Sequence, residues 1–151
     1  MSVCALTGHR HLPPDFRADV VYDDLEALIK EGYDTFLCGM AWGFDLKALE
    51  CLIALRQKYR IRLDAYVPFD GQENSFPPEE RKKYKELISW CDVVHILYPA
   101  YQQGCYLLRD RAMVDRADLV YAYCTRNTGG TAYTVKYARS RGLEVRLFKK
   151  P

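Results

Sequence analysis

Apolar residues along the chain fall into two alternating patterns. Short runs of β-branched and other apolar residues recur at residues 3–6, 35–38, 63–67, 93–97, 119–123 and 145–148. Several of these runs are continuously apolar, which is typical of strands that are buried on both faces of a sheet. Longer stretches between them carry apolar residues at helical spacing. The pattern predicts six strands that alternate with five helices.

Proline and glycine positions suggest where the helices begin and end. Pro13-Pro14 is expected to open the first helix and Gly32 to close it. Pro77-Pro78 is expected to open the third helix, and Gly142 to stop the fifth. The second, fourth and fifth helices are expected over residues 45–59, 105–116 and 130–141.

This alternation predicts an α/β fold of the doubly wound, Rossmann-like class. Right-handed crossovers between parallel strands place helices on both faces of a mostly parallel six-stranded sheet. In the common strand order 3-2-1-4-5-6, the ligand crevice lies at the carboxyl ends of the first and fourth strands. No linker or repeat interrupts the pattern, so we expect one domain over residues 1–151.

Composition and charge narrow the classes of partner. The chain has 22 Lys and Arg against 20 Asp and Glu, a net charge of +2, with the two signs interspersed. This balance disfavours a nucleic-acid or membrane surface but allows a local basic pocket. The chain has no secretory signal pattern and no apolar run long enough to span a membrane, which predicts a cytoplasmic protein. Its six cysteines contain no C-x-x-C, so buried thiols are expected rather than a metal site or disulfides.

The loop after the first predicted strand reads Thr7-Gly8-His9-Arg10. Gly8 permits a tight turn, and Arg10 places a guanidinium at the expected crevice, where a phosphate or carboxylate is its best partner. The alternative is an ordinary turn with a surface arginine. His9 is interpreted either as a general acid or stacking group, or as a polar turn residue.

The second predicted strand leads into the segment Gly39-Met40-Ala41-Trp42-Gly43-Phe44-Asp45. Its two glycines flank a strand-to-helix turn at Ala41, where backbone N–H groups and the helix dipole favour an anion. The spacing of these glycines differs from G-x-G-x-x-G, which disfavours a nicotinamide-dependent dehydrogenase. Asp45, in the first helical turn, either interacts with the helix dipole or accepts hydrogen bonds from ribose hydroxyls.

Three further positions are candidates for ligand binding. Gln72 lies in a long loop after the third strand and is expected either to contact a base or sugar, or to belong to a simple connection. Arg109 lies early in the fourth helix, where the dipole disfavours a cation, so an anion is its expected partner; a solvated helix face is the alternative. Gly129-Gly130-Thr131 presents bare N–H donors and a hydroxyl at the start of the fifth helix, as a phosphate site requires.

These motifs, in this order, resemble the SLOG superfamily. That Rossmann-like group includes DprA and the "lonely guy" (LOG) proteins, and the chain is most similar to its YpsA-like branch. The resemblance is carried by Thr7-Gly8-His9-Arg10, Gly39–Asp45, Arg109–Asp115 and Gly129-Gly130-Thr131, and it spans nearly the whole chain. It implies a fold that binds nucleotide-type ligands. For the YpsA-like branch it implies ADP-ribose-like ligands and an undefined biochemical role.

The resemblance to the LOG enzymes is incomplete. These phosphoribohydrolases cut the base–ribose bond of nucleoside monophosphates with an arginine and with a glutamate in a P-G-G-x-G-T-x-x-E motif. Arg109, four residues before Met113, matches the arginine. Thr134 stands at the place of the glutamate, and a hydroxyl cannot activate water as a carboxylate does.

We therefore expect a nucleotide- or ADP-ribose-binding domain with a sensing or regulatory output. The residues expected to hold the ligand are Gly8, His9, Arg10, Gly39, Ala41, Gly43, Asp45, Gln72, Arg109, Gly129, Gly130 and Thr131. One alternative is a LOG-like N-glycosidase with Arg109 as a catalytic residue. Another is single-strand binding of the DprA type, which the near-neutral charge makes a poor prediction. No cofactor, metal or membrane partner is predicted, and a homodimer is left open by the 12 tyrosines.

Overall fold

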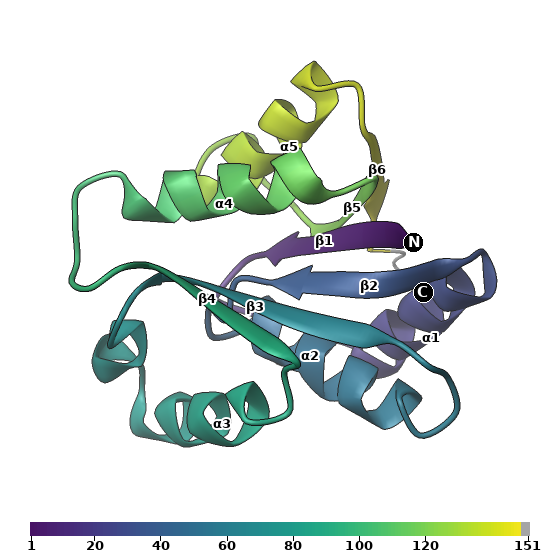
Figure 1. The fold of residues 1–151 in the computed structure, drawn as a ribbon, viewed down its shortest axis with the longest axis horizontal. Coiled ribbons are helices and arrows are strands. Elements are labelled where there is room, and N and C mark those ends of the chain that lie inside the picture. Colours follow the sequence, from purple (N-terminus) through teal and green to yellow (C-terminus); the bar gives the residue numbers. More distant parts are fainter. Residues whose placement is uncertain (149–151) are drawn as a thin grey trace.

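The computed structural model describes residues 1–148 and contains a six-stranded sheet with helices on both faces (Figure 1). The strands are β1 (Ser2–Gly8), β2 (Tyr33–Cys38), β3 (Arg62–Phe69), β4 (Val93–Tyr98), β5 (Leu119–Tyr123) and β6 (Glu144–Leu147). The helices are α1 (Ala18–Lys30), α2 (Phe44–Leu55), α3 (Pro78–Ile88), α4 (Cys105–Arg116) and α5 (Gly130–Ser140), with a short 3-10 helix, η1 (Gln72–Ser75). Every strand pair is parallel, which confirms the doubly wound α/β class.

The strand order is β4-β3-β2-β1-β5-β6, so the expected order 3-2-1-4-5-6 is wrong. The fourth strand extends the sheet beyond β3 and does not pair with β1. Its position at the edge explains why Val94 and Ile96 are 41% and 51% exposed, whereas all five residues of β5 are buried. The reversal of strand order, and with it the expected ligand crevice, therefore lies between β1 and β5.

Two of the predicted helices have different limits in the structure. Pro13-Pro14 does not open α1, because the Phe16 N–H donates to the Pro13 carbonyl in a turn and the helix begins only at Ala18. Helix α2 ends at Leu55, and turn hydrogen bonds continue as far as Tyr59. The expected starts of α3, α4 and α5 agree with the structure.

Apolar side chains cover both faces of the sheet. Figure 1 shows α1, α2 and α3 on one face and α4 and α5 on the other. Leu25, Leu49 and Leu87 pack on the first face, and Met113 and Val135 on the second. All six cysteines are free thiols, and half of them are fully buried. Among residues 1–148, no helix is both long and apolar enough to cross a membrane.

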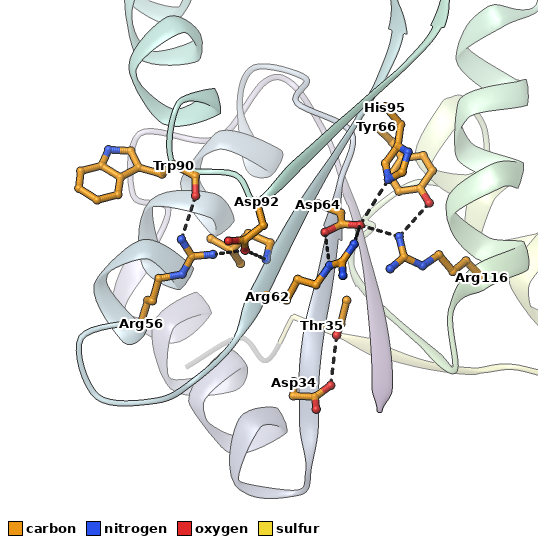
Figure 2. A network of polar contacts seen from close by, with 11 residues as sticks. Asp34, Thr35, Arg56, Arg62, Asp64, Tyr66, Trp90, Asp92, His95 and Arg116 are labelled. Atoms are coloured by element: carbon orange, nitrogen blue, oxygen red, sulfur yellow. Dashed lines mark hydrogen bonds and ion pairs between the residues drawn. The ribbon is translucent and has the colours of Figure 1, made fainter.

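A buried carboxylate joins α4 and the edge strand β4 to β3 (Figure 2). The Asp64 side chain is fully buried and accepts hydrogen bonds from Arg62 Nε at 2.8 Å and Arg116 Nη1 at 2.7 Å. His95 Nε2 lies 3.3 Å from the same carboxylate, and Arg116 also donates to the Tyr66 hydroxyl. Burial raises the pKa of Asp64, but these hydrogen bonds outweigh burial and hold its pKa at about 2.

The substitution Asp64→Asn is expected to lower the free energy of unfolding by about 1–3 kcal/mol at pH 7, because the amide loses charge-assisted hydrogen bonds. The pKa of Asp64 is lower in the folded chain than in the unfolded chain, so its contribution is present above about pH 4 and is lost as the pH falls through about 2. Urea unfolding at pH 7 and pH 2.5 should show that wild type and variant differ less in their free energy of unfolding at pH 2.5 than at pH 7. The stabilising role of ionised Asp64 is contradicted if this difference is the same at both pH values. It is also contradicted if the exposed control Asp34→Asn lowers the free energy of unfolding as much as Asp64→Asn.

Candidate functional site

A cavity of about 360 Å³ opens at the carboxyl ends of β1 and β5. Four segments line it: the end of β1 with the loop that follows, the β2–α2 loop with the start of α2, the first turns of α4, and the loop that leads into α5. Its lining residues are Leu6, Thr7, Gly8, His9, Arg10, Ala41, Asp45, Tyr106, Arg109, Asp110, Arg126, Thr128, Gly129, Gly130 and Thr131. We call this cavity the crevice.

The N-terminus of α5 supplies hydrogen-bond donors to the crevice. Gly129 is its N-cap residue, with φ of 96°, and no side chain caps the helix there. A Cβ placed on Gly129 or Gly130 would meet no atom within 4 Å, so the backbone at this turn is open to the cavity. The first N–H groups of a helix have no intrahelical acceptor and carry its positive dipole end. This turn is therefore suited to an anion.

Two exposed guanidinium groups flank this helix terminus. Arg10 extends over the Tyr106 ring, with 5.4 Å between Cζ and the ring centroid, and Arg126 lies in the β5–α5 loop. Neither forms an ion pair with a carboxylate among the described residues. Both guanidinium groups are therefore free to form ion pairs with an anionic ligand, although the carboxyl groups of Asp45 and Asp110 line the same cavity.

Asp45 brings a carboxylate with an unused acceptor into the same cavity. The residue is 6% exposed, and its Oδ2 accepts a hydrogen bond from the Ala41 N–H at 3.2 Å. Its Oδ1 is buried and has no hydrogen-bond partner within residues 1–148. Burial raises the pKa of Asp45 to about 7, although the charge of Arg109 and the Ala41 N–H oppose the rise. A hydroxyl or N–H of a ligand would satisfy this oxygen.

Arg109 lines the crevice, but most of its guanidinium is used within the protein. Nε donates to Asp110 at 2.8 Å, and Nη1 donates to the carbonyl oxygens of Gly39 and Tyr66. A Cβ on Gly39 would lie 2.7 Å from Nη1, so only glycine permits this approach. Gln72 Nε2 also donates to the Gly39 carbonyl, at 3.3 Å. Arg109 and Gln72 together hold the β2–α2 loop in place.

The loops after β1 and β2 pack directly on each other. The Phe44 N–H donates to the His9 carbonyl at 3.1 Å. Gly43 has φ of 90°, and a Cβ on it would lie 2.1 Å from the Arg10 carbonyl oxygen. The close approach of these two backbones therefore requires glycine at position 43, and it fixes the path of the β1 loop at Arg10.

His9 connects the β1 loop to the β5 loop across the point where the strand order reverses. Its Nε2 accepts a hydrogen bond from the Thr125 N–H at 2.9 Å, and its ring packs edge-on against Tyr123. Burial lowers the pKa of His9, and the positive charge of Arg126 lowers it further. A neutral imidazole is consistent with a ring nitrogen that accepts a hydrogen bond.

The crevice brings together most of the residues expected from the sequence. Those that line it are Gly8, His9, Arg10, Ala41, Asp45, Arg109, Gly129, Gly130 and Thr131. Gly39, Gly43 and Gln72 lie behind the lining, where they position the β2–α2 loop and do not face the cavity. This placement differs from the expectation that they contact the ligand.

Sequence reasoning missed several lining residues. Tyr106, three residues before Arg109, falls on the same helical face, and this spacing could have identified it. Arg126 and Thr128 stand between the fifth strand and the diglycine, where the sequence pattern singles out only Gly129-Gly130-Thr131. Leu6 and Thr7 belong to the end of β1 itself.

The fold and the position of the crevice define a Rossmann-like α/β protein. The YpsA family model, described as the YspA SLOG family, matches residues 17–146. The chain therefore belongs to the YpsA SLOG family, which confirms the expectation from its motifs. It is 28% identical to the UPF0398 protein BH1768 of Halalkalibacterium halodurans over 93% of this chain and 82% of that protein. It is 24% identical to the UPF0398 protein OB1025 of Oceanobacillus iheyensis over 78% of this chain and 71% of that protein.

Solved structures share the fold at low sequence identity. DNA processing protein A (DprA) from Streptococcus pneumoniae superposes with a TM-score of 0.71 at 19% identity, over 97% of this chain. This chain spans only half the length of that protein. DprA from Helicobacter pylori, described for its single-stranded DNA binding mode, gives 0.71 at 16% identity, over 99% of this chain and 66% of its own. The structure of TM1055 superposes with a TM-score of 0.61 at 17% identity, over 96% of this chain and 72% of the TM1055 chain.

The buried carboxyl of Asp45 should make stability depend on pH. Its pKa is higher in the folded chain than in the unfolded chain, so folding takes up a proton between about pH 4 and pH 7. The free energy of unfolding should therefore fall as the pH rises through this range, by at most about 1.4 kcal/mol per pH unit from this group. Urea unfolding at pH 5, 6, 7 and 8 should show a shallower decline in Asp45→Asn than in wild type. The exposed control Asp15→Asn should show the same decline in the free energy of unfolding as wild type. If Asp45→Asn declines as steeply as these two proteins, this role of Asp45 is ruled out.

Proposed function

We propose that the crevice binds a small phosphorylated ligand of the nucleotide or ADP-ribose type, and that binding serves sensing or regulation. The proposal rests mainly on the N-terminus of α5, where bare N–H donors face the cavity between Arg10 and Arg126. A helix N-terminus with flanking guanidinium groups supplies both the donors and the charge that a phosphate requires. The family itself has no assigned biochemical function, as the names of its UPF0398 members reflect.

The remaining lining residues suit the rest of such a ligand. In the proposed pose, the phosphate accepts hydrogen bonds from the N–H groups of Gly130 and Thr131. The Tyr106 ring, with Arg10 over it, lines the cavity, and a base or a sugar would pack against this aromatic–guanidinium pair. Asp45 Oδ1 accepts a hydrogen bond from a ribose hydroxyl, which would satisfy its missing partner. One cavity thus presents separate features for phosphate, sugar and base.

Single-stranded DNA is a competing ligand, because the structure of H. pylori DprA was described for that binding mode. Two observations favour a small ligand for this chain. The crevice is about 360 Å³, within the usual range for a small-molecule site. The net charge of the chain is only +2, whereas binding to a strand relies on a groove whose positive charge follows the backbone.

Ligand-induced stabilisation tests the proposal. AMP, ADP-ribose, NAD and cyclic dinucleotides are each added in a thermal-shift assay, where a ligand at 100 times its Kd contributes about 2.7 kcal/mol. We expect at least one of them to raise the Tm of the wild type by a few degrees. The proposal fails if none of the four raises the Tm.

Gly130 offers a matched pair of variants for the same assay. Neither Gly130→Asp nor Gly130→Asn introduces a clash, because the position is open, and an acidic residue is favoured at a helix N-terminus. The Asp variant should lose the ligand-induced shift through charge repulsion, while the Asn variant retains part of it. An undiminished shift in Gly130→Asp would place the ligand elsewhere.

A second candidate function is hydrolysis of the N-glycosidic bond of a nucleoside monophosphate. Thr134 stands at the place of the LOG glutamate. Its Oγ1 lies 3.0 Å from Asp110 Oδ2 and 2.9 Å from the Gly130 carbonyl oxygen. The Asp110 carboxylate is therefore close to the position where the glutamate is expected, and Asp45 adds a second carboxyl group with a pKa of about 7. Such a pair matches the acid and base that glycoside cleavage requires.

This candidate function predicts release of free adenine from AMP, measured by liquid chromatography after prolonged incubation. Asp110→Asn should reduce the rate of adenine release at least about 100-fold, in line with the usual contribution of general acid–base catalysis. AMP that remains intact while it stabilises the protein would leave binding as the function. Equal release by wild type and Asp110→Asn would point to a contaminating enzyme.

A further inference from the structure

A second cavity, of about 290 Å³, lies beside the crevice on the other side of the β5–α5 loop. Residues 124–127 form one wall, and the end of β6 contributes Leu147. The other wall is one face of α5, with Ala132, Val135, Lys136 and Arg139 at helical spacing. We call this cavity the α5 pocket.

The α5 pocket carries positive charge that no lining residue neutralises. Arg126, Lys136 and Arg139 all contribute to its walls, and no aspartate or glutamate does. Lys136 Nζ donates to the Asn127 carbonyl at 3.0 Å, which keeps its ammonium group at the loop. Arg141, two residues beyond Arg139, instead lies 3.6 Å from Asp115. A concave surface with uncompensated cations concentrates anions.

The floor of the α5 pocket is apolar. Ala132 and Val135 are buried, and Leu147 at the end of β6 is 46% exposed. A free inorganic anion would gain nothing from these side chains, whereas the sugar or base of a nucleotide would bury apolar surface against them. The combination of cations above an apolar floor therefore favours an organic phosphate.

The two cavities share their dividing wall. Arg126 lines both of them, and the Thr125 that lines the α5 pocket donates its N–H to His9 in the crevice. A ligand that extends from the N-terminus of α5 past Arg126 would reach Lys136 and Arg139 in the α5 pocket. The α5 pocket is therefore placed to continue the crevice.

We propose that the α5 pocket is a second anion subsite, and that the ligand of this protein is a dinucleotide-type molecule whose two separated phosphate groups occupy the crevice and the α5 pocket. This inference rests on the proposed function of the crevice. Lys136 and Arg139 bind the second phosphate, Arg126 lies between the two phosphates, and the apolar floor contacts the nucleoside attached to the second phosphate. A mononucleotide would fill the crevice alone and bind more weakly.

Isothermal titration of the full chain with AMP and with the 5′-phosphorylated dinucleotide pApA separates the two sites. Wild type should bind pApA at least about tenfold more tightly than AMP, as expected for one additional set of charge-assisted hydrogen bonds. The double variant Lys136→Gln/Arg139→Gln should reduce this ratio to about twofold or less, with an unchanged Kd for AMP. The control Lys82→Gln/Lys85→Gln removes the same charge from exposed positions on α3 and should behave as wild type.

Each other outcome overturns a different claim. If AMP binds but pApA gains nothing over it, the second subsite is wrong while the crevice stands. If the α3 control loses the advantage of pApA as well, the effect reflects general charge and the subsite is again wrong. If neither compound binds, the proposed function fails and this inference fails with it. If affinity continues to rise from pApA to a dodecamer of thymidylate, the surface binds a single strand, and a dinucleotide-type ligand is excluded.

Discussion

The buried guanidinium of Arg109 is the interaction on which the geometry of the crevice depends. At 5% exposure, this charge would be very unfavourable without partners, and it has them on three elements. It donates to Asp110 on its own helix α4, to the Gly39 carbonyl of the β2–α2 loop and to the Tyr66 carbonyl of β3. The β2–α2 loop that it holds contains Met40, whose φ of 61° is unusual for a side chain of this size. The Ala41 N–H that binds Asp45 follows directly, so Arg109 indirectly positions the carboxylate in the crevice.

This arrangement separates residues that build the site from residues that face a ligand. The glycines after β2 resemble a phosphate-binding loop in sequence, yet their lack of side chains serves close packing against Arg109 and the β1 loop. The diglycine before α5 has open space around it and is therefore available to an anion. Proposed binding thus depends on the α5 N-terminus, while the β2–α2 loop supplies the support and one carboxylate.

The sequence allowed much of the fold to be predicted, because the alternation of buried runs and amphipathic stretches is a strong local signal. The strand order was not predictable in this way. Residues 93–97 are as apolar as a central strand, but Val94 and Ile96 are exposed at the sheet edge, and only tertiary packing decides that position. The start of α1 was missed because a proline pair is compatible with both a turn and a first helical turn.

The site could be predicted to a similar extent. Glycines and arginines next to strand ends identified most of the lining, since the carboxyl ends of parallel strands converge on one edge. Gln72 and Arg109 were expected to bind a ligand, but much of their hydrogen bonding is internal, which depends on distances between residues far apart in the chain. The position of Arg126 in the walls of both cavities depends on how the β5–α5 loop folds, so it could not be predicted from the sequence.

Backbone amide chemical shifts during a titration with AMP test the central claim most directly, namely that the helix terminus between β1 and β5 binds a phosphate. The account predicts that the largest changes occur at the N–H groups of Gly130 and Thr131, with smaller ones in the loop at residues 124–128 and at Arg10. Saturable changes centred on another part of the fold, or none at millimolar AMP, would contradict it.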